Sequence, residues 1–145
     1  MKFTIFGANG FIGRALYLSL MAQGHEVQAP NRGDQFEPGE VLGHVVYAIG
    51  LTGDFRQRPL DTVDAHVGVL SKLIRTTNID SLLYLSSTRV YGLDKGIGPY
   101  CETDSVSIVP SIDSLYNLSK LLGESICLSA KNNKFRIARL SNVYG

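Results

Sequence analysis

The sequence has no tryptophan, only two cysteines, and almost no excess of charge of either sign. A net charge of +1 does not provide the basic surface that nucleic acids or anionic membranes require, so neither is an expected partner. Cys101 and Cys127 are too few for a zinc cluster or a disulfide framework, so no metal site is expected. Two free thiols also favour a reducing cytoplasm as the location.

Long apolar runs are missing as well. No uninterrupted apolar stretch reaches the roughly 18 residues that a membrane helix needs, so no membrane span is expected. Met1 and Lys2 lead straight into a strand-like run, so no signal peptide is expected. What is present is a globular balance over 145 residues, 44% hydrophobic and 19% charged, which fits one domain with its own core.

Short apolar strands alternate with helical patterns along the chain. Strands are expected at 2–6, 25–29, 44–50, 81–87 and 135–140, and helices through about residue 23, at 60–77 and at 114–130. Apolar strands that alternate with helices predict an α/β fold, a doubly wound parallel sheet between two helical layers. Residues 30–43 and 92–113 are rich in turn-forming residues and are expected to be loops, so the crossover after the second strand is short.

Two helical segments carry an apolar stripe that is expected to face the core. In the segment 60–77 the stripe consists of Val63, Val67, Leu70, Leu73 and Ile74. In the segment 114–130 it consists of Leu115, Leu118, Leu122 and Ile126. Both segments are therefore expected to pack these residues against the sheet.

The first strand runs into a glycine turn, GANGFIG, at residues 7–13. Its glycines, Gly7, Gly10 and Gly13, are three residues apart and open a helix. Glycine permits a positive φ and lets a diphosphate approach the backbone, while the helix N-terminus supplies N–H groups and partial positive charge. A tight strand–helix turn without a ligand has the same composition, but the strand–turn–helix context favours a Rossmann-type dinucleotide site.

The end of the second strand bears on which dinucleotide fits. An acid about 20 residues past the glycines would bind the ribose 2′-hydroxyl of NAD. Here the strand ends in Gln28 and leads to Arg32, and Asp34 comes only after a further glycine. Arg32, helped by Arg14, suits a 2′-phosphate, which favours NADP slightly over NAD. The alternative is that Arg32 is a solvated loop residue.

Tyr116 and Lys120 are four residues apart in a predicted helix and therefore share one face. A neighbouring ammonium group stabilises a phenolate, which would let Tyr116 donate or accept a proton near neutral pH. The same spacing is common in helices that have no catalytic role. It gains meaning only beside the glycine turn and a second polar signal.

That second signal is YLSSTRVYG at residues 84–92. It begins as a buried strand and ends with the hydroxyls of Ser86, Ser87 and Thr88. Ligands of parallel sheets bind beyond the carboxyl ends of the strands. These hydroxyls are therefore expected to face a site rather than to cap a loop.

Together four motifs resemble one family. GANGFIG, SSTRVYG, YNLSK and RLSNVYG follow one another in the order and spacing of the extended short-chain dehydrogenase/reductases, the NAD-dependent epimerase/dehydratase family. PYCETDS at 99–105 also resembles the family's substrate loop. The resemblance covers almost the whole chain. It implies a nicotinamide cofactor and chemistry on a nucleotide sugar.

The resemblance also implies roles for particular residues. Ser87 would hydrogen-bond the substrate oxygen, Tyr116 would move its proton, and Lys120 would hold the nicotinamide ribose and favour the phenolate. Hydride would pass between the nicotinamide and a sugar carbon. The implied cofactor-binding residues are Gly7, Asn9, Gly10, Phe11, Ile12, Gly13, Arg32, Ala48, Ile49, Gly50, Ser86, Tyr116 and Lys120. The implied substrate-binding residues are Ser87, Thr88 and Asn142.

Some positions depart from the family's pattern. His66 stands where an asparagine that supports the lysine is common. Thr88 and Arg89 replace the acid pair that sugar dehydratases use, which argues against dehydration. The short crossover omits an acid that binds adenine. Family members continue well beyond this length, so residues 1–145 are expected to be an NAD(P)-binding Rossmann domain without the C-terminal substrate-binding part.

The expected function is therefore an NAD(P)-dependent nucleotide-sugar epimerase or ketoreductase, with a tyrosine as acid and base. The alternative is a non-catalytic or truncated dinucleotide-binding module, such as a sensor or an inactive fragment. The residues serve epimerases and reductases alike and do not choose between them. Family members often dimerise through two helices, one of which carries the tyrosine and lysine, so a homodimer is a further expectation.

Overall fold

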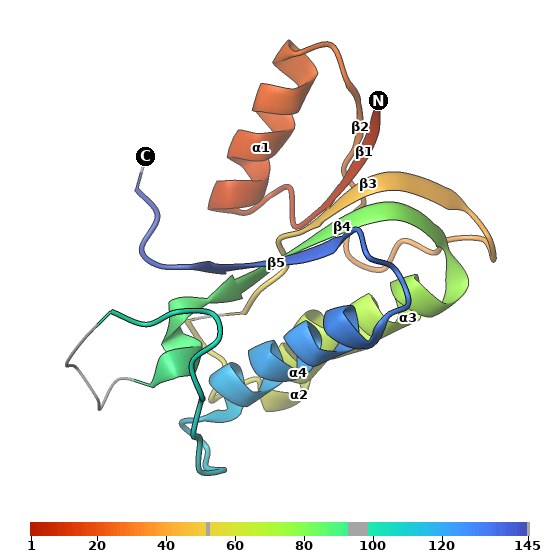
Figure 1. The fold of residues 1–145 in the computed structure, drawn as a ribbon. Coiled ribbons are helices and arrows are strands. Elements are labelled where there is room, and N and C mark those ends of the chain that lie inside the picture. The colour runs from red at the N-terminus through yellow and green to blue at the C-terminus, as the bar shows by residue number, and fades with distance from the viewer. Residues whose placement is uncertain (52, 93–98, 145) are drawn as a thin grey trace.

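A computed structural model describes residues 1–51, 53–92 and 99–144 of the chain. Five strands form a single sheet in which every pairing is parallel, in the order β2-β1-β3-β4-β5 (Figure 1). The strands are β1 (Lys2–Phe6), β2 (Glu26–Gln28), β3 (Val41–Tyr47), β4 (Asn78–Ser87) and β5 (Phe135–Leu140). The predicted parallel α/β fold is confirmed.

Helices cover both faces of the sheet, which gives the three predicted layers. The helical segments are α1 (Phe11–Ala22), α2 (Pro59–Val63), the π-helix η1 (Asp64–Gly68), α3 (Val69–Thr76), the 3₁₀ turn η2 (Thr88–Tyr91) and α4 (Leu115–Ser129). Figure 1 shows α1 on one side of the sheet and α2, α3 and α4 together on the other. The predicted helix at 60–77 is thus continuous in sequence but contains a π turn in its middle.

The third strand begins earlier than predicted and ends before the predicted glycine. Val41 already pairs with Asn78, and the register shifts on both sides of Gly43, whose φ is 68°. A side chain at this position would overlap the backbone of Lys2, so glycine and the bulge go together. As a result, residues 48–50 lie outside the strand and form a loop at its carboxyl end.

The connection between β2 and β3, residues 29–40, contains neither helix nor strand. The chain instead passes from the edge strand across to the far side of β1. Phe36 from this connection packs edge-on against Phe6, with ring centroids 5.6 Å apart. The shortened crossover is therefore confirmed, and a loop stands where a helix would otherwise flank the carboxyl end of β1.

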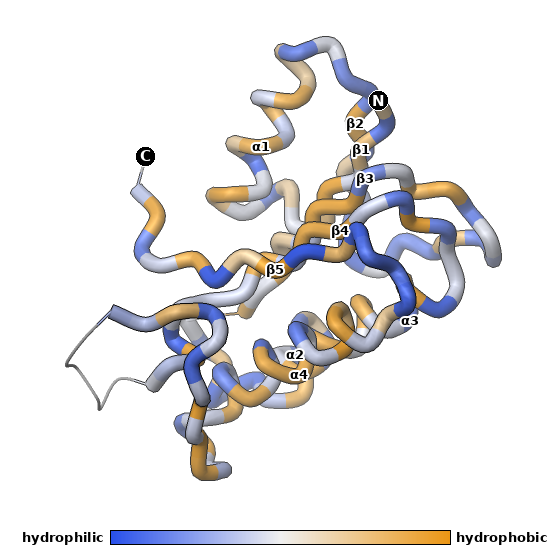
Figure 2. Tube along the Cα trace, viewed as in Figure 1, coloured by the Kyte–Doolittle hydropathy of each residue, from blue (hydrophilic) through white to orange (hydrophobic). Residues whose placement is uncertain are grey.

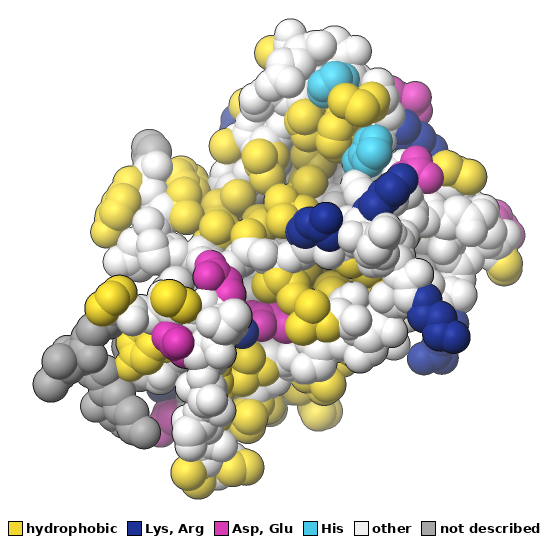
Figure 3. Space-filling model, in the orientation of Figure 1, with side chains coloured by type: hydrophobic (Ala, Val, Ile, Leu, Met, Phe, Trp, Pro, Cys, Tyr) yellow, Lys and Arg dark blue, Asp and Glu magenta, His cyan; other side chains and the backbone are white. Residues whose placement is uncertain are grey.

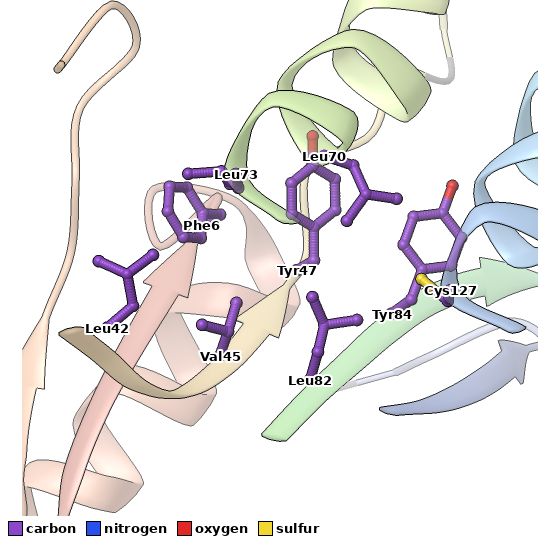
Figure 4. Packing of buried hydrophobic residues seen from close by; sticks show 9 residues of the cluster. All are labelled: Phe6, Leu42, Val45, Tyr47, Leu70, Leu73, Leu82, Tyr84 and Cys127. Carbon is purple, nitrogen blue, oxygen red and sulfur yellow. The ribbon is translucent and has the colours of Figure 1, made fainter. Parts of the chain in front are cut away.

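The larger core lies between the sheet and the α3–α4 layer. Its buried members are Phe6, Leu42, Val45, Tyr47, Leu70, Leu73, Leu82, Tyr84 and Cys127. Tyr47 and Tyr84 stack at 5.8 Å, and Figure 4 shows their hydroxyls directed away from the sheet toward the helices. These hydroxyls donate to the carbonyls of Ala65 and His66 in the π-helix, at 2.7 and 3.3 Å. Two buried phenols are thereby satisfied by the irregular turn.

The predicted core stripe of α4 is only partly right, because Ile126 packs against the core but Leu122 does not. The buried face of this helix consists of Tyr116, Ser119, Lys120, Gly123, Glu124 and Cys127. Leu122, expected inside, is 50% exposed. The reason is that α4 turns its polar site residues toward the sheet, where β4 and the π-helix offer partners. Apolar periodicity alone therefore did not identify the fully buried residues of this helix.

Polarity along the chain follows these layers. Figure 2 shows hydrophobic residues concentrated along the strands and a hydrophilic connection between α4 and β5. On the face that Figure 3 shows, hydrophobic side chains gather between α1 and the lower helices, and lysine and arginine lie at separate points. In the described residues, no helix is long and apolar enough to cross a membrane.

Candidate active site

The glycine turn joins β1 to α1 with almost no space for side chains. Gly7 has a φ of 87°, and its carbonyl accepts the Gly10 N–H at 3.0 Å. A side chain on Gly7 would press on the Ala48 backbone, and one on Gly13 would overlap the Gly7 carbonyl. Gly10 caps α1 without a side-chain hydrogen bond. The backbone of β1, α1 and the loop after β3 therefore meets closely, as the spacing predicts.

A cavity of about 480 Å³ opens beside this turn. It lies at the carboxyl ends of β1 and β3, where the strand order reverses and where ligands of open α/β sheets bind. Five of the expected cofactor-binding residues line it: Gly7, Asn9, Arg32, Ile49 and Gly50. The opposite wall comes from the connection after β2 and from the α2–α3 stretch, including Phe36 and Val69.

Charged side chains at the cavity are largely paired with one another. Arg32 lies 3.6 Å from Asp61 across the opening, and Asp61 also binds Arg58 at 2.7 Å. Asp34 accepts the Asn31 N–H at 2.8 Å, which closes a turn near the beginning of the connection between β2 and β3. The expected 2′-phosphate ligand, Arg32, thus already has an acidic partner.

Lys120 reaches from α4 to the loop that follows β3. Its ammonium group donates to the carbonyls of Leu85 at 2.9 Å and Ile49 at 3.3 Å. Burial lowers the pKa of Lys120 to about 8, and nearby Glu124 partly offsets the effect. Among the described residues, the third N–H of the ammonium has no acceptor. The Lys120 nitrogen is close to Gly50, since a Cβ added to this glycine would lie 3.7 Å from it. A ligand atom bound against Gly50 would therefore be near the third N–H.

His66 connects this loop to α4 from inside the π-helix. Its side chain is fully buried, and its Nδ1 lies 2.8 Å from the Ser119 hydroxyl. Its Nε2 accepts the Leu51 N–H at 3.3 Å. Because Ser119 donates its own proton to the Tyr116 carbonyl, Nδ1 must donate and the ring must be neutral. Burial and the Lys120 charge agree with this state, since they lower the pKa of His66 to about 3.

Tyr116 lies among three side chains from other elements. Its ring is 5.1 Å from His66, 5.8 Å from Phe55, and 4.7 Å from the Arg89 guanidinium. The side chain is 5% exposed, yet its hydroxyl has no hydrogen-bond partner within the part of the chain that the structure describes. The ring is thus buried, while the hydroxyl is not among the buried polar atoms that lack a partner in the described residues, so it is open to a ligand.

Ser87 ends β4 and begins the 3₁₀ turn. Its hydroxyl accepts the Arg89 N–H at 3.2 Å, so the serine caps η2. The neighbouring Thr88 donates to the Leu140 carbonyl at 3.4 Å, at the end of β5. Helix α4, which carries Tyr116, contacts both β4 and η2, so the strand end and Tyr116 lie on adjacent elements.

Ser86 faces a different environment from the one expected. Its hydroxyl donates to Glu124 at 2.5 Å, inside the interface between β4 and α4. Glu124 also binds Arg139 of β5 through both carboxylate oxygens, and Arg139 donates to the Tyr91 hydroxyl at 2.9 Å. The hydrogen bond with Glu124 raises the pKa of Arg139. This buried ion pair holds the ends of β4, β5 and η2 against the helix.

Phe11 and Asn142 are among the expected ligand-binding residues that are exposed. Phe11 is 59% exposed at the start of α1, and Asn142 is exposed after β5. The sequence analysis did not identify Arg89, Phe55 or Glu124 as parts of the site. For Glu124 a signal was available, because it follows Lys120 by four residues on the same helical face. Within the described residues, no group of acidic, histidine or cysteine side chains is arranged to hold a metal ion.

The comparisons with known proteins agree with these motifs. The model of the NAD dependent epimerase/dehydratase family matches residues 3–145. A curated subunit of a mitochondrial NADH dehydrogenase [ubiquinone], alpha subcomplex subunit 9 of Dictyostelium discoideum, is 25% identical over 98% of this chain and 42% of its own length.

Solved structures share the fold over the whole chain. UDP-glucuronic acid 4-epimerase from Bacillus cereus, in complex with NAD, is 21% identical, with a TM-score of 0.73 over 100% of this chain and 57% of its own. A dTDP-4-dehydrorhamnose reductase from Clostridium acetobutylicum is 22% identical, with a TM-score of 0.76 over 100% of this chain and 55% of its own. The chain therefore spans about half the length of these proteins.

Proposed function

The chain belongs to the NAD-dependent epimerase/dehydratase family, and on this premise we propose that residues 1–145 are the NAD(P)-binding domain of a nucleotide-sugar epimerase or ketoreductase. The observation that carries the proposal is the cavity at the glycine turn, whose lining includes Gly50; a Cβ added at Gly50 would lie 3.7 Å from the Lys120 ammonium nitrogen. Glycine backbone at one end and an unpaired ammonium donor at the other fit a diphosphate and a nicotinamide ribose.

Three side chains would have separate roles in this reaction. A bound nicotinamide supplies hydride transfer. Lys120, fixed by the Leu85 and Ile49 carbonyls, would donate its remaining N–H to the ribose and keep positive charge close to Tyr116. The Tyr116 hydroxyl would take the proton from a sugar hydroxyl or return it to a ketone. Ser87 would orient the same oxygen, since its hydroxyl can still donate while it accepts from Arg89.

For the cofactor, we propose a slight preference for NADP over NAD. No acid follows β2 directly, and Arg32 lines the cavity. The pairing of Arg32 with Asp61 limits this preference, because a 2′-phosphate must compete with the carboxylate. Replacing Arg32 by alanine should lower the affinity for NADP relative to NAD. An unchanged ratio of the two dissociation constants would remove the basis for this preference.

The second candidate function is a non-catalytic dinucleotide-binding module. The similarity to a subunit of an NADH dehydrogenase favours it, because that protein matches almost the whole chain. This module would bind cofactor without hydride transfer to a sugar. The two functions differ in what they require of Tyr116. Proton transfer to or from a sugar requires its hydroxyl, whereas binding of the dinucleotide does not depend on it.

The deciding experiment replaces Tyr116 by phenylalanine in the full natural chain. Hydride transfer, followed by the absorbance of the reduced nicotinamide, should fall by about two to four orders of magnitude because the proton donor is lost. The dissociation constant of the dinucleotide should stay unchanged. Tyr17→Phe in α1 is the matched control and should retain full activity. Equal turnover of the Tyr116 variant and the wild type would contradict the catalytic assignment, and cofactor binding without any turnover would favour the module.

We also propose that the protein forms a homodimer through α4 and α2. Leu122 is 50% exposed and Leu60 is 83% exposed on these adjacent helices. Apolar side chains that are exposed together on neighbouring helices favour association. Sedimentation of the wild type and of Leu122→Glu tests this proposal, which requires the variant to be monomeric. A cytoplasmic location stays a prediction from the two free cysteines.

A further inference from the structure

The arginines around the crevice differ in whether they have an acidic partner. Arg32, Arg56, Arg58 and Arg139 each pair with a carboxylate. Arg89 has no ion pair and no side-chain hydrogen bond with any described residue. Its guanidinium is held only by aromatic rings, 4.7 Å from the Tyr116 centroid and 5.8 Å from that of Phe55. A half-buried guanidinium with free donors is prepared for an anion that the described part of the chain does not supply.

Arg89 lies where the proposed reaction would occur. Its own N–H donates to the Ser87 hydroxyl, and its side chain stacks on Tyr116. These two residues would both contact the reacting oxygen of the substrate. A group that is bound by Arg89 would therefore belong to the part of the substrate next to the reacting carbon, and not to its distant nucleotide.

We propose that Arg89 binds a carboxylate on the sugar, so that the substrate of the proposed function is a nucleotide-linked uronic acid. The inference rests on that proposed function and names its substrate class. A guanidinium matches a carboxylate through two parallel N–H···O bonds, which fix the orientation of the group as well as its charge. Stacking on Tyr116 and Phe55 leaves the edge of the guanidinium available, because cation–π contact uses only its face.

A neutral sugar gives no reason for this arrangement. A hydroxyl needs only a neutral partner, whereas the half-buried guanidinium of Arg89 has lost part of its hydration without gaining an acidic partner among the described residues. The charge of a bound carboxylate offsets this loss. Arg56 serves as a natural comparison, because its guanidinium also stacks on Phe55, at 4.5 Å, but is already bound by Asp113.

The test uses the 145-residue chain saturated with NAD, and glucuronate, glucose and inorganic phosphate as probes. Binding is followed by the NMR signals of the arginine side-chain N–H groups and of the neighbouring backbone amides. The variants are Arg89→Gln and, as a matched control, Arg56→Gln. Saturation with NAD is measured first, so that loss of the proposed function is recognised separately as a failure to bind the dinucleotide.

Glucuronate should shift the Arg89 signals with a dissociation constant on the order of millimolar, and glucose should bind at least about tenfold more weakly. Arg89→Gln should weaken glucuronate binding about tenfold or more and leave NAD binding unchanged, while Arg56→Gln should stay within about twofold of the wild type. The proposal is overturned if an NAD-saturated chain fails to bind glucuronate, binds glucose or phosphate as well as glucuronate, or does not respond to Arg89→Gln.

Discussion

The glycine turn would contact a dinucleotide through its backbone. The region around Tyr116, which we call the Tyr116 end, would contact it through side chains that come from several elements. At the turn, Gly7 and Gly13 make room by having no side chain. At the other end, Lys120, His66 and Glu124 are almost completely buried. Each of these polar groups has a hydrogen bond to a residue distant in sequence.

This difference has consequences for stability. A backbone site is disturbed when side-chain volume is added, because close-packed atoms cannot move apart without cost. A site made of buried polar groups is disturbed when one partner is removed, because the other is then left in a medium of low dielectric. The two ends of the crevice should therefore respond to opposite kinds of substitution and to different changes of pH.

The largest effect is expected for Glu124→Gln at the Tyr116 end. The carboxylate accepts from Ser86 and binds Arg139, and the side chains of this ion pair are 5% and 12% exposed. Removing the negative charge leaves Arg139 buried without an acidic partner, so the free energy of unfolding should fall by about 4 kcal/mol. Urea unfolding at neutral pH measures the change.

The control for this variant is Asp113→Asn. Asp113 pairs with Arg56, but both side chains are more than half exposed. Water already solvates exposed pairs, so this substitution should cost less than about 1 kcal/mol. Equal losses for the buried and the exposed pair would contradict the description of the Tyr116 end.

The glycine turn should respond to added volume instead. In Gly13→Val the new side chain would overlap the Gly7 carbonyl and crowd Ala8, which are both backbone groups. We expect a loss of about 3 kcal/mol in unfolding free energy, together with loss of dinucleotide binding. Gly53→Ala, where nothing lies within 4 Å of the added carbon, should change stability by less than about 0.5 kcal/mol. Wild-type binding by Gly13→Val, measured calorimetrically, would refute the close approach.

Acid should act on the Tyr116 end through His66. The pKa of this residue is about 3 in the folded chain and 6.5 in the unfolded chain, so below pH 6.5 only the unfolded state takes up the proton. Stability should therefore decrease as the pH falls, by about 2 kcal/mol between pH 7 and pH 5. His66→Asn should lose this part of the pH dependence, and His44→Asn, at a half-buried position in β3, should keep it. Identical pH profiles for both variants in urea unfolding would exclude His66 as the cause.

The smallest effect is expected at the cavity opening, where the charges are exposed. Asp61→Asn frees Arg32, so the affinity for NADP relative to NAD should rise about threefold, the range of a solvent-exposed ion pair. Asp54→Asn is the control, because Asp54 contacts Arg58 but not Arg32. The ratio of the two dissociation constants decides the outcome, and a ratio that is unchanged in Asp61→Asn would separate Arg32 from cofactor selection.

The same contrast explains what could be predicted from the sequence. The parallel sheet and the turn at Gly7, Gly10 and Gly13 were predicted correctly, because strand periodicity and glycine spacing are local properties. The buried face of α4 was not, because its polar residues are satisfied only by β4, β5 and the π-helix. The tyrosine and lysine motif predicted a site on α4, which stays a prediction. Arg89 entered the sequence analysis only as a position without the acid that dehydratases have. Its stacking on Tyr116 is a long-range contact that no local pattern contains.

Amide hydrogen exchange with and without NAD tests the central claim, that one crevice runs from the glycine turn to Lys120. Saturating NAD should slow exchange at residues 8–14, at residues 49–51 and around the Ser87 turn. His25 and Asn78, which lie at the amino ends of β2 and β4, should not change and serve as internal references. Protection at all three segments is the predicted result. Unchanged exchange at saturating NAD, or protection confined to the amino ends of the strands, would contradict the account.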